Sequence, residues 1–214
     1  MTEKKKPTVS ILEDGPYLVK GLEHLRSADG ALQAQETMAL CRCGGSKNKP
    51  FCDGTHAKLG FSGKNTADSS KDKRESYEGT AITVHDNRSI CAHAGYCTEG
   101  LPSVFRMKER PWIAPVSASA DEVIATVGQC PSGALSFSVD GVEHRDQEQE
   151  PSIMVAKNGP YVVSGGPELI DVPRAEGASS NHYTLCRCGG SKNKPFCDGA
   201  HWSIKFDDTN NKEV

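Results

Sequence analysis

Three cysteines and one histidine occur together twice in this chain, each time within sixteen residues. Residues 40–54 and 185–199 carry the same fifteen letters, LCRCGGSKNKPFCDG, and a histidine stands two positions after both copies. Thiolate sulfur and imidazole nitrogen bind zinc and the irons of iron–sulfur clusters. The sequence therefore predicts two metal centres of one kind, with the ligands Cys41, Cys43, Cys52 and His56 in the first copy and Cys186, Cys188, Cys197 and His201 in the second.

The motif in both copies, C-x-C-x2-S-x3-P-x-C-D-G-x-H, resembles the signature of the CDGSH iron-sulfur domains, the family that includes mitoNEET. Thr55 and Ala200 stand where the family motif has serine, which is not a ligand position. The resemblance implies that each loop holds one [2Fe-2S] cluster through three cysteines and one histidine, so that the chain binds two [2Fe-2S] clusters. Zinc is the alternative, although zinc sites usually leave two to four residues between paired cysteines.

The spacing within each loop indicates how a two-iron cluster would be held. Two cysteines separated by one residue can bind one iron, which leaves Cys52 and His56 for the other. We expect Asp53 to cap a short helix that carries His56. We also expect the Ser46 hydroxyl and nearby backbone N–H groups to donate hydrogen bonds to cluster sulfurs. A ligating imidazole is neutral, so acid should release the clusters, and replacing both histidines by cysteine should suppress that release.

The remaining three cysteines lie between the two copies and indicate a third centre. Cys91, Cys97 and the C-P pair at Cys130 resemble a divergent single-cluster ferredoxin, in which C-x2-C-x2-C precedes a distant C-P. Ala94 stands where the middle cysteine is expected. Three thiolates could hold a [3Fe-4S] cluster, His93 could complete a [4Fe-4S] cluster, or the cysteines could be core residues without a cluster. The form C-x-H-x3-C resembles a ferredoxin-like domain found beside CDGSH domains, which favours a bound cluster.

The composition limits the class of protein. The chain has 214 residues, is 36% hydrophobic and carries a net charge of −3, so nothing indicates nucleic acid or an acidic membrane surface as a partner. No apolar stretch approaches the roughly 20 residues that span a bilayer, and the N-terminus MTEKKKP lacks the apolar part of a secretory leader. We therefore expect a cytoplasmic protein whose nine cysteines serve as metal ligands rather than in disulfides.

The repeat extends beyond the metal loops. Residues 8–20 and 152–165 each place an Asp-Gly or Asn-Gly pair between two β-prone runs, which predicts two hairpins. Polar loops are expected at 21–37 and 166–182. Between the repeats the pattern predicts the order β-α-β-β-α-β, and Ser119 with Glu122 forms a capping box at the start of the second helix.

The expected fold class is α+β, with two small β-rich CDGSH modules in a pseudo-two-fold pair and a ferredoxin-like insert. The predicted boundaries are 7–63 for CDGSH iron-sulfur domain 1, 64–78 for a linker, 79–142 for the divergent ferredoxin-like domain, 143–150 for a second linker and 151–207 for CDGSH iron-sulfur domain 2. The internal pair predicts a monomer.

The expected function is one-electron transfer by an iron–sulfur protein that is not an enzyme. A cluster carrier or redox/pH sensor is one alternative, and a zinc-stapled interaction module is another. Expected partners are redox proteins or apo-acceptors of clusters. Four loop lysines either form a solvated rim or dock an acidic redox partner: Lys47, Lys49, Lys192 and Lys194. Four histidines lack partners at ligand spacing and are expected at the surface or in turns: His24, His85, His144 and His182.

Overall fold

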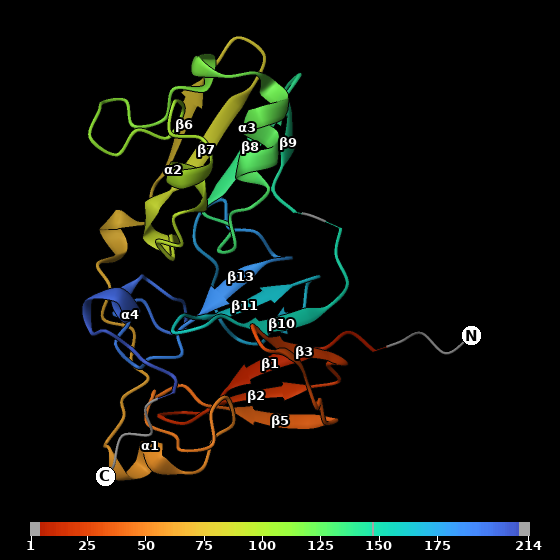
Figure 1. The fold of residues 1–214 in the computed structure, drawn as a ribbon, viewed down its shortest axis with the longest axis vertical. Helices are drawn as coiled ribbons and strands as arrows, with labels where there is room; N and C mark the ends of the chain where they lie inside the picture. The colour runs from red at the N-terminus through yellow and green to blue at the C-terminus, as the bar shows by residue number, and fades with distance from the viewer. Residues whose placement is uncertain (1–4, 147, 210–214) are drawn as a thin grey trace.

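A computed structural model describes residues 5–146 and 148–209, and three small β-sheets form its frame (Figure 1). The beginning of the charged N-terminus, one residue of the second predicted linker and the last five residues lie outside the described part. Two sheets are built from the repeated halves of the chain, and the third is built from the segment between them.

The repeated halves form sheets with the strand orders β12-β1-β2-β5 and β13-β11-β10-β3-β4. Their strands are β1 Thr8–Ile11, β2 Tyr17–Lys20, β3 His24–Ser27, β4 Gly30–Leu32, β5 Thr37–Leu40, β10 Ser152–Val155, β11 Tyr161–Ser164, β12 Glu168–Leu169 and β13 Tyr183–Leu185. The hairpins β1–β2 and β10–β11 confirm the two predicted turns, in which Asp14 and Asn158 have φ angles of 45° and 51°.

The two halves exchange strands. β3 of the first half pairs in parallel with β10 of the second, and β12 of the second half pairs in parallel with β1 of the first. Strands β3 and β4 lie in segment 21–37 and β12 lies in segment 166–182, so the prediction of polar loops there is wrong in part. A short polar segment carries little local strand signal, and here the edge of the other half supplies its hydrogen-bond partners.

One hydrophobic core joins both halves. It includes Val9 and Val19 from the first half together with Ile153 and Val163 from the second, all with 0% exposure. The rings of Tyr17 and Tyr161 meet edge to face at its centre, with their centroids 6.0 Å apart. The two halves therefore share their buried apolar surface, which stabilises them as one body.

The segment between the halves has a second, separate core under an antiparallel sheet of order β6-β7-β8-β9. Its elements are the single turns η1 Ser69–Lys71, η2 Arg88–Ile90 and η3 Pro115–Ser117, the helices α2 Tyr96–Gly100 and α3 Ala120–Val127, and the strands β6 Arg74–Glu78, β7 Thr83–Asn87, β8 Leu135–Val139 and β9 Val142–His144. We call this unit, from β6 to β9, the middle domain.

The middle domain differs from the predicted order of elements. The segments expected as its second and third strands meet only through one bridge, between Phe105 and Ile113. Strand β6 lies in the first predicted linker, and β9 reaches into the second. The helix start is as predicted: Glu122 N–H donates to the Ser119 hydroxyl at 3.4 Å, and Ser119 N–H donates to the Glu122 carboxylate at 2.9 Å.

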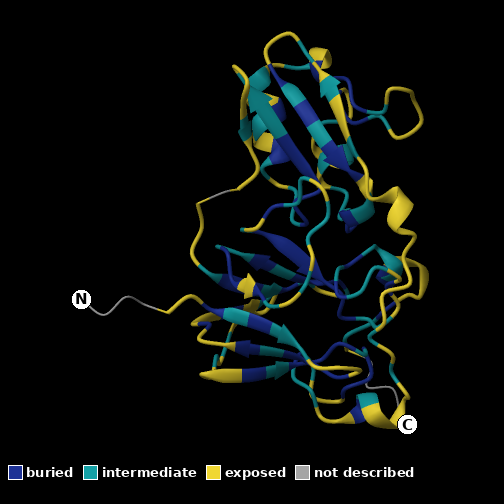
Figure 2. Cartoon of the chain, turned by 180° about the vertical axis from the view of Figure 1, so that it is seen from behind, coloured by how far each residue is buried: buried dark blue, intermediate teal, exposed yellow. Residues whose placement is uncertain are grey.

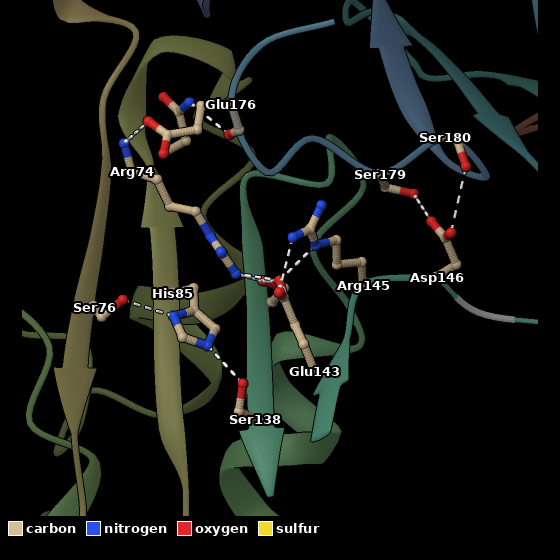
Figure 3. Close-up of polar contacts among 12 residues, drawn as sticks. Arg74, Ser76, His85, Ser138, Glu143, Arg145, Asp146, Glu176, Ser179 and Ser180 are labelled. Carbon is tan, nitrogen blue, oxygen red and sulfur yellow. Dashed lines mark hydrogen bonds and ion pairs between the residues drawn. The ribbon is translucent and has the colours of Figure 1, made fainter. Parts of the chain in front are cut away.

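The middle domain docks on the second half of the chain and lies far from the helix of the first metal loop (Figure 1). Polar contacts from β6 and from the segment just after β9 reach the second half (Figure 3). Arg74 N–H donates to Glu176 at 3.3 Å, and Asp146 accepts from the Ser179 hydroxyl at 2.5 Å. Asn87 adds a hydrogen bond of 2.9 Å to the Glu176 carbonyl.

Buried residues concentrate in the central strands of the three sheets, whereas the loops and short helices carry most of the exposed residues (Figure 2). Among the described residues, no helix has both the length and the apolar character needed to cross a membrane.

Candidate metal centres

Each repeated loop gathers its four predicted ligands as two close pairs. The sulfurs of Cys41 and Cys43 lie 3.8 Å apart, and the sulfur of Cys52 lies 3.3 Å from Nδ1 of His56. The second loop repeats this arrangement, with 3.8 Å between the sulfurs of its C-x-C pair and 3.4 Å between the sulfur of Cys197 and Nδ1 of the histidine that follows it.

The two pairs do not converge on one point. Across residues 5–146 and 148–209, no three histidine, cysteine, aspartate or glutamate side chains are close enough to hold a single metal ion. A tetrahedral zinc site requires four ligands within about 2.0–2.3 Å of one ion. Two separate pairs instead suit a centre with two metal atoms, each bound by one pair.

Strand ends and a tight turn position the ligands of each loop. The loop begins where β5 ends, and Cys41 N–H donates to the Pro50 carbonyl at 2.8 Å. Gly54 then takes a φ angle of 86° and starts α1, Thr55–Lys58. Gly199 does the same at 82° before α4, Ala200–Ser203. Only glycine adopts this left-handed conformation without steric cost, and it turns the histidine back toward the preceding cysteine.

Asp53 and Ser46 stabilise the loop through hydrogen bonds. The Asp53 carboxylate accepts from Thr55 N–H at 3.0 Å and from Lys47 N–H at 2.8 Å. The N-cap of α1 is Gly54, so the prediction that Asp53 caps the helix is wrong by one residue. The Ser46 hydroxyl donates to the Phe51 carbonyl at 2.6 Å, so the prediction that it donates to a cluster sulfur is wrong. Backbone groups take that role, since Gly45 N–H lies 3.4 Å from the sulfur of Cys43.

The thiols have strongly shifted pKa values. The hydrogen bond with Cys43 lowers the pKa of Cys41 to about 6, and the same contact raises the pKa of Cys43. In the second loop, the contact with Cys188 lowers the pKa of Cys186 to about 7. The first proton of each pair is therefore lost more easily than the second, and a bound cation would favour loss of the second proton. The thiol pairs are therefore suited to bind a metal.

The two loops touch each other. A Cβ atom placed on Gly44 would lie 2.6 Å from the carbonyl oxygen of Cys188, and one on Gly189 would lie 2.6 Å from that of Cys43. Tyrosines exchanged between the halves also hold the loops. The Tyr17 hydroxyl lies 2.9 Å from the carbonyl oxygen of Cys186, and Tyr161 makes the reciprocal contact with Cys41 at 2.9 Å. The two ligand sets thus lie side by side across the pseudo-two-fold axis.

The second loop contacts the middle domain. The imidazole of His93 lies against Gly199, where an added Cβ would be 2.8 Å from its Cδ2 atom. Trp202 Nε1–H donates to the His93 carbonyl at 3.2 Å, and the Asn193 side chain donates to the Ser89 carbonyl at 2.9 Å. His201 is 5% exposed, and burial lowers its pKa.

The three cysteines of the middle domain line one cavity. Cys91 follows the turn η2, Cys97 lies in α2 and Cys130 follows α3, and all three face this cavity beside Ala94. Burial raises the pKa of Cys91 and raises that of Cys97 to about 11. His93 is at the rim, with its ring against the second loop. The structure thus brings the three predicted thiols together at one site.

Asp86, which the cysteine pattern does not predict as a site residue, lines the same cavity. Its side chain is 1% exposed, and burial raises its pKa to about 7 against the opposing effect of Arg88. The signal was available: Asp86 interrupts the apolar alternation of a strand that precedes a cysteine loop. His182 is a second correction, because it is buried and lies 2.9 Å from the Ser179 hydroxyl rather than at the surface.

Comparisons with known proteins agree with this arrangement. The family described as iron-binding zinc finger, CDGSH type, matches residues 14–57 and 158–202. The family described as divergent 4Fe-4S mono-cluster matches residues 77–140. The uncharacterized protein YjdI of Escherichia coli, from strains K12 and O157:H7, is 39% identical over 61 residues, which are 28% of this chain and 80% of YjdI.

A more distant relative is the pyridine nucleotide-disulfide oxidoreductase domain-containing protein 1 of Pongo abelii, 26% identical over 111 residues, or 51% of this chain and 21% of that protein. No solved structure matches the chain. The chain therefore belongs to the CDGSH iron-sulfur family. It is a tandem CDGSH protein with a central divergent single-cluster ferredoxin-like domain, and it binds iron–sulfur clusters.

Proposed function

We propose that this protein carries single electrons, using two Cys3His [2Fe-2S] clusters in the CDGSH loops and a third cluster in the middle domain. The observation that carries the proposal is the division of each ligand set into two pairs, one for each iron. A [2Fe-2S] cluster accepts and returns one electron. The chain's own contribution is to hold the two loops in contact at Gly44 and Gly189, which keeps both sites within one rigid body.

The protein is proposed as an electron carrier rather than a catalyst. All nine cysteines are free thiols, which supports a reducing compartment such as the cytoplasm. The shared core of the two halves supports a monomer, because each half already covers the apolar face of the other. The oxidoreductase in the name of one distant relative is in keeping with a redox role.

The exposed lysines of the loops, Lys47 and Lys192, support docking of an acidic redox partner. The other two loop lysines form hydrogen bonds within their own loops. Nζ of Lys49 donates to the Ser46 carbonyl at 2.7 Å, and Nζ of Lys194 donates to the Ser191 carbonyl at 2.5 Å.

Iron and sulfide analysis with visible spectroscopy tests the cluster assignment, and zinc in place of iron would refute it. To test electron transfer, the purified protein is reduced and reoxidised while its absorption and EPR signals are followed. Reversible cycling with retained iron is expected. The opposite result would establish the alternative of a cluster carrier. In that case the protein is not reduced reversibly, and its clusters pass to an apo-ferredoxin during the cycle.

A further inference from the structure

Asp86 is an acidic residue in the hydrophobic core of the middle domain. It lies on β7 two positions after Val84, so both side chains point to the buried face of the sheet. Its neighbours across the sheet are Leu135, which is also buried, and Glu75, whose negative charge raises the pKa of Asp86 further. Asp86 is 1% exposed, and neither of its carboxylate oxygens has a hydrogen-bond partner of normal geometry among the described residues, although the Trp112 side chain is close enough to lower its pKa.

A buried carboxyl without partners is costly. Buried polar groups are almost always hydrogen-bonded, and an unpaired ionised carboxylate costs several kcal/mol or more in the interior (about 2–7 for a neutral polar group alone). The nearest cation does not remove this cost, because the Arg88 guanidinium lies over the ring of Trp112, 4.7 Å from its centroid, and makes no hydrogen bond to Asp86. A carboxylate in this position is expected to bind a ligand.

The cavity beside Asp86 is the one that the three thiols line. Three thiolates bind three corners of a cubane cluster and leave the fourth iron without a protein ligand. The methyl group of Ala94, at the expected fourth position, has no donor atom. His93 is directed elsewhere, because its imidazole packs on Gly199 of the second CDGSH loop. Among the described residues that line this cavity, Asp86 supplies the only carboxylate, while Ser132 and Tyr96 supply neutral hydroxyl groups.

We propose that Asp86 is the fourth protein ligand of a [4Fe-4S] cluster in the middle domain, with Cys91, Cys97 and Cys130 as the other three. This inference rests on the third cluster of the proposed function. Carboxylate oxygen is an established ligand of iron in proteins. It carries the same charge as the thiolate that it replaces, so the net charge of the cluster and its ligands equals that of a four-cysteine site.

The test compares the full-length protein with Asp86→Ala, which removes the ligand, and Asp86→Cys, which restores one. Each protein is reconstituted anaerobically and then treated with ferricyanide. Loss of the unprotected corner releases one Fe2+ and passes one electron to ferricyanide, which leaves an oxidised three-iron cluster that is visible by EPR. We expect Asp86→Ala to convert at least tenfold faster than wild type and Asp86→Cys to return to the wild-type rate or slower.

The two CDGSH clusters provide an internal control, because their reduced EPR signals should be the same in every variant. Asp121→Ala, an exposed acidic residue in the first turn of α3, is the matched surface control and should behave as wild type. Removal of an unpartnered buried carboxyl should not prevent folding, and the far-ultraviolet circular dichroism of the apo variant checks this.

Three outcomes would overturn the proposal. The first is equal conversion in Asp86→Ala and wild type. The second is rapid conversion in His93→Ala with none in Asp86→Ala, which would assign the fourth corner to the histidine. The third is a wild-type protein with only the two CDGSH signals and the iron content of two [2Fe-2S] clusters. That result would remove the third cluster as well, yet it would leave electron transfer by the CDGSH pair intact.

Discussion

The two CDGSH loops have the same fifteen residues but not the same surroundings. The first loop faces outward, with His56 partly exposed and Asn48 exposed. In the second loop His201 is buried, and the equivalent asparagine, Asn193, donates a hydrogen bond to the middle domain. Identical ligand sets therefore have different access to solvent, and any difference in their chemistry must come from the surrounding structure.

A second difference lies beneath the loops. Arg187 is fully buried and pairs with Asp208 at 2.5 Å, while its Nε donates to the Gly159 carbonyl at 2.9 Å. In the first half the equivalent arginine is Arg42, and Gly63 stands at the position that corresponds to Asp208, next to the Arg42 guanidinium. The Nε atom of Arg42 is buried without a hydrogen-bond partner among the described residues. Among the described residues, the second half thus has an ion pair at a position where the first half has none.

The difference between the two loops should have its largest effect on the stability of their clusters in acid. Loss of iron requires protonation of the ligating imidazole, and burial lowers the pKa of His201, so its protonation needs a lower pH. As the pH falls, the cluster of the first loop should be lost first, while the second persists. Visible absorption and iron content of the variants His56→Cys and His201→Cys, followed from neutral to acid pH, assign each phase. Loss of both clusters in one phase in the wild-type protein would contradict the prediction.

The ion pair should produce the next largest difference. Arg187→Ala leaves Asp208 without its cation and should cost about 3 kcal/mol of unfolding free energy, because breaking a buried pair leaves an uncompensated charge. Arg42→Ala is the matched control and should cost about 1 kcal/mol, mainly from lost contact with the rings of Tyr17 and Phe61. Urea unfolding measures both. Equal losses would show that Asp208 contributes nothing to the difference.

A smaller difference is expected at the two glycines that start the helices. Gly54→Ala and Gly199→Ala share a cost of about 1 kcal/mol for the left-handed backbone. An added methyl group meets nothing within 4 Å at Gly54, whereas at Gly199 it would lie 2.8 Å from His93. Gly199→Ala should therefore lose about 1 kcal/mol more. If urea unfolding gives the same value for both variants, the middle domain does not press on the second loop.

The smallest expected effect concerns Trp202, whose indole donates to the His93 carbonyl although the side chain is 65% exposed. Trp202→Phe removes this hydrogen bond and keeps the ring, and it should cost about 0.5 kcal/mol. Circular dichroism during urea unfolding is the measurement, because the substitution removes a fluorophore. An unchanged midpoint would mean that the other contacts alone dock the middle domain.

The sequence by itself determined the features that depend on neighbours along the chain. The paired ligands, the Asp-Gly and Asn-Gly hairpins and the Ser119 capping box all involve residues a few positions apart, so their spacing encodes their hydrogen bonds and ligand pairs. The same local patterns distinguished the three cysteines of the middle domain and predicted that they meet.

Only the tertiary structure decided which segments from distant parts of the chain lie together. β3 and β12 find their partners in the opposite half, so their short polar sequences could not identify them as strands. Asp86 became a candidate ligand only when its strand placed it, without a hydrogen-bond partner, in the cavity of three thiols. The two identical loops came to differ because the middle domain packs on one of them, and burial depends on what lies near a residue in space rather than along the chain.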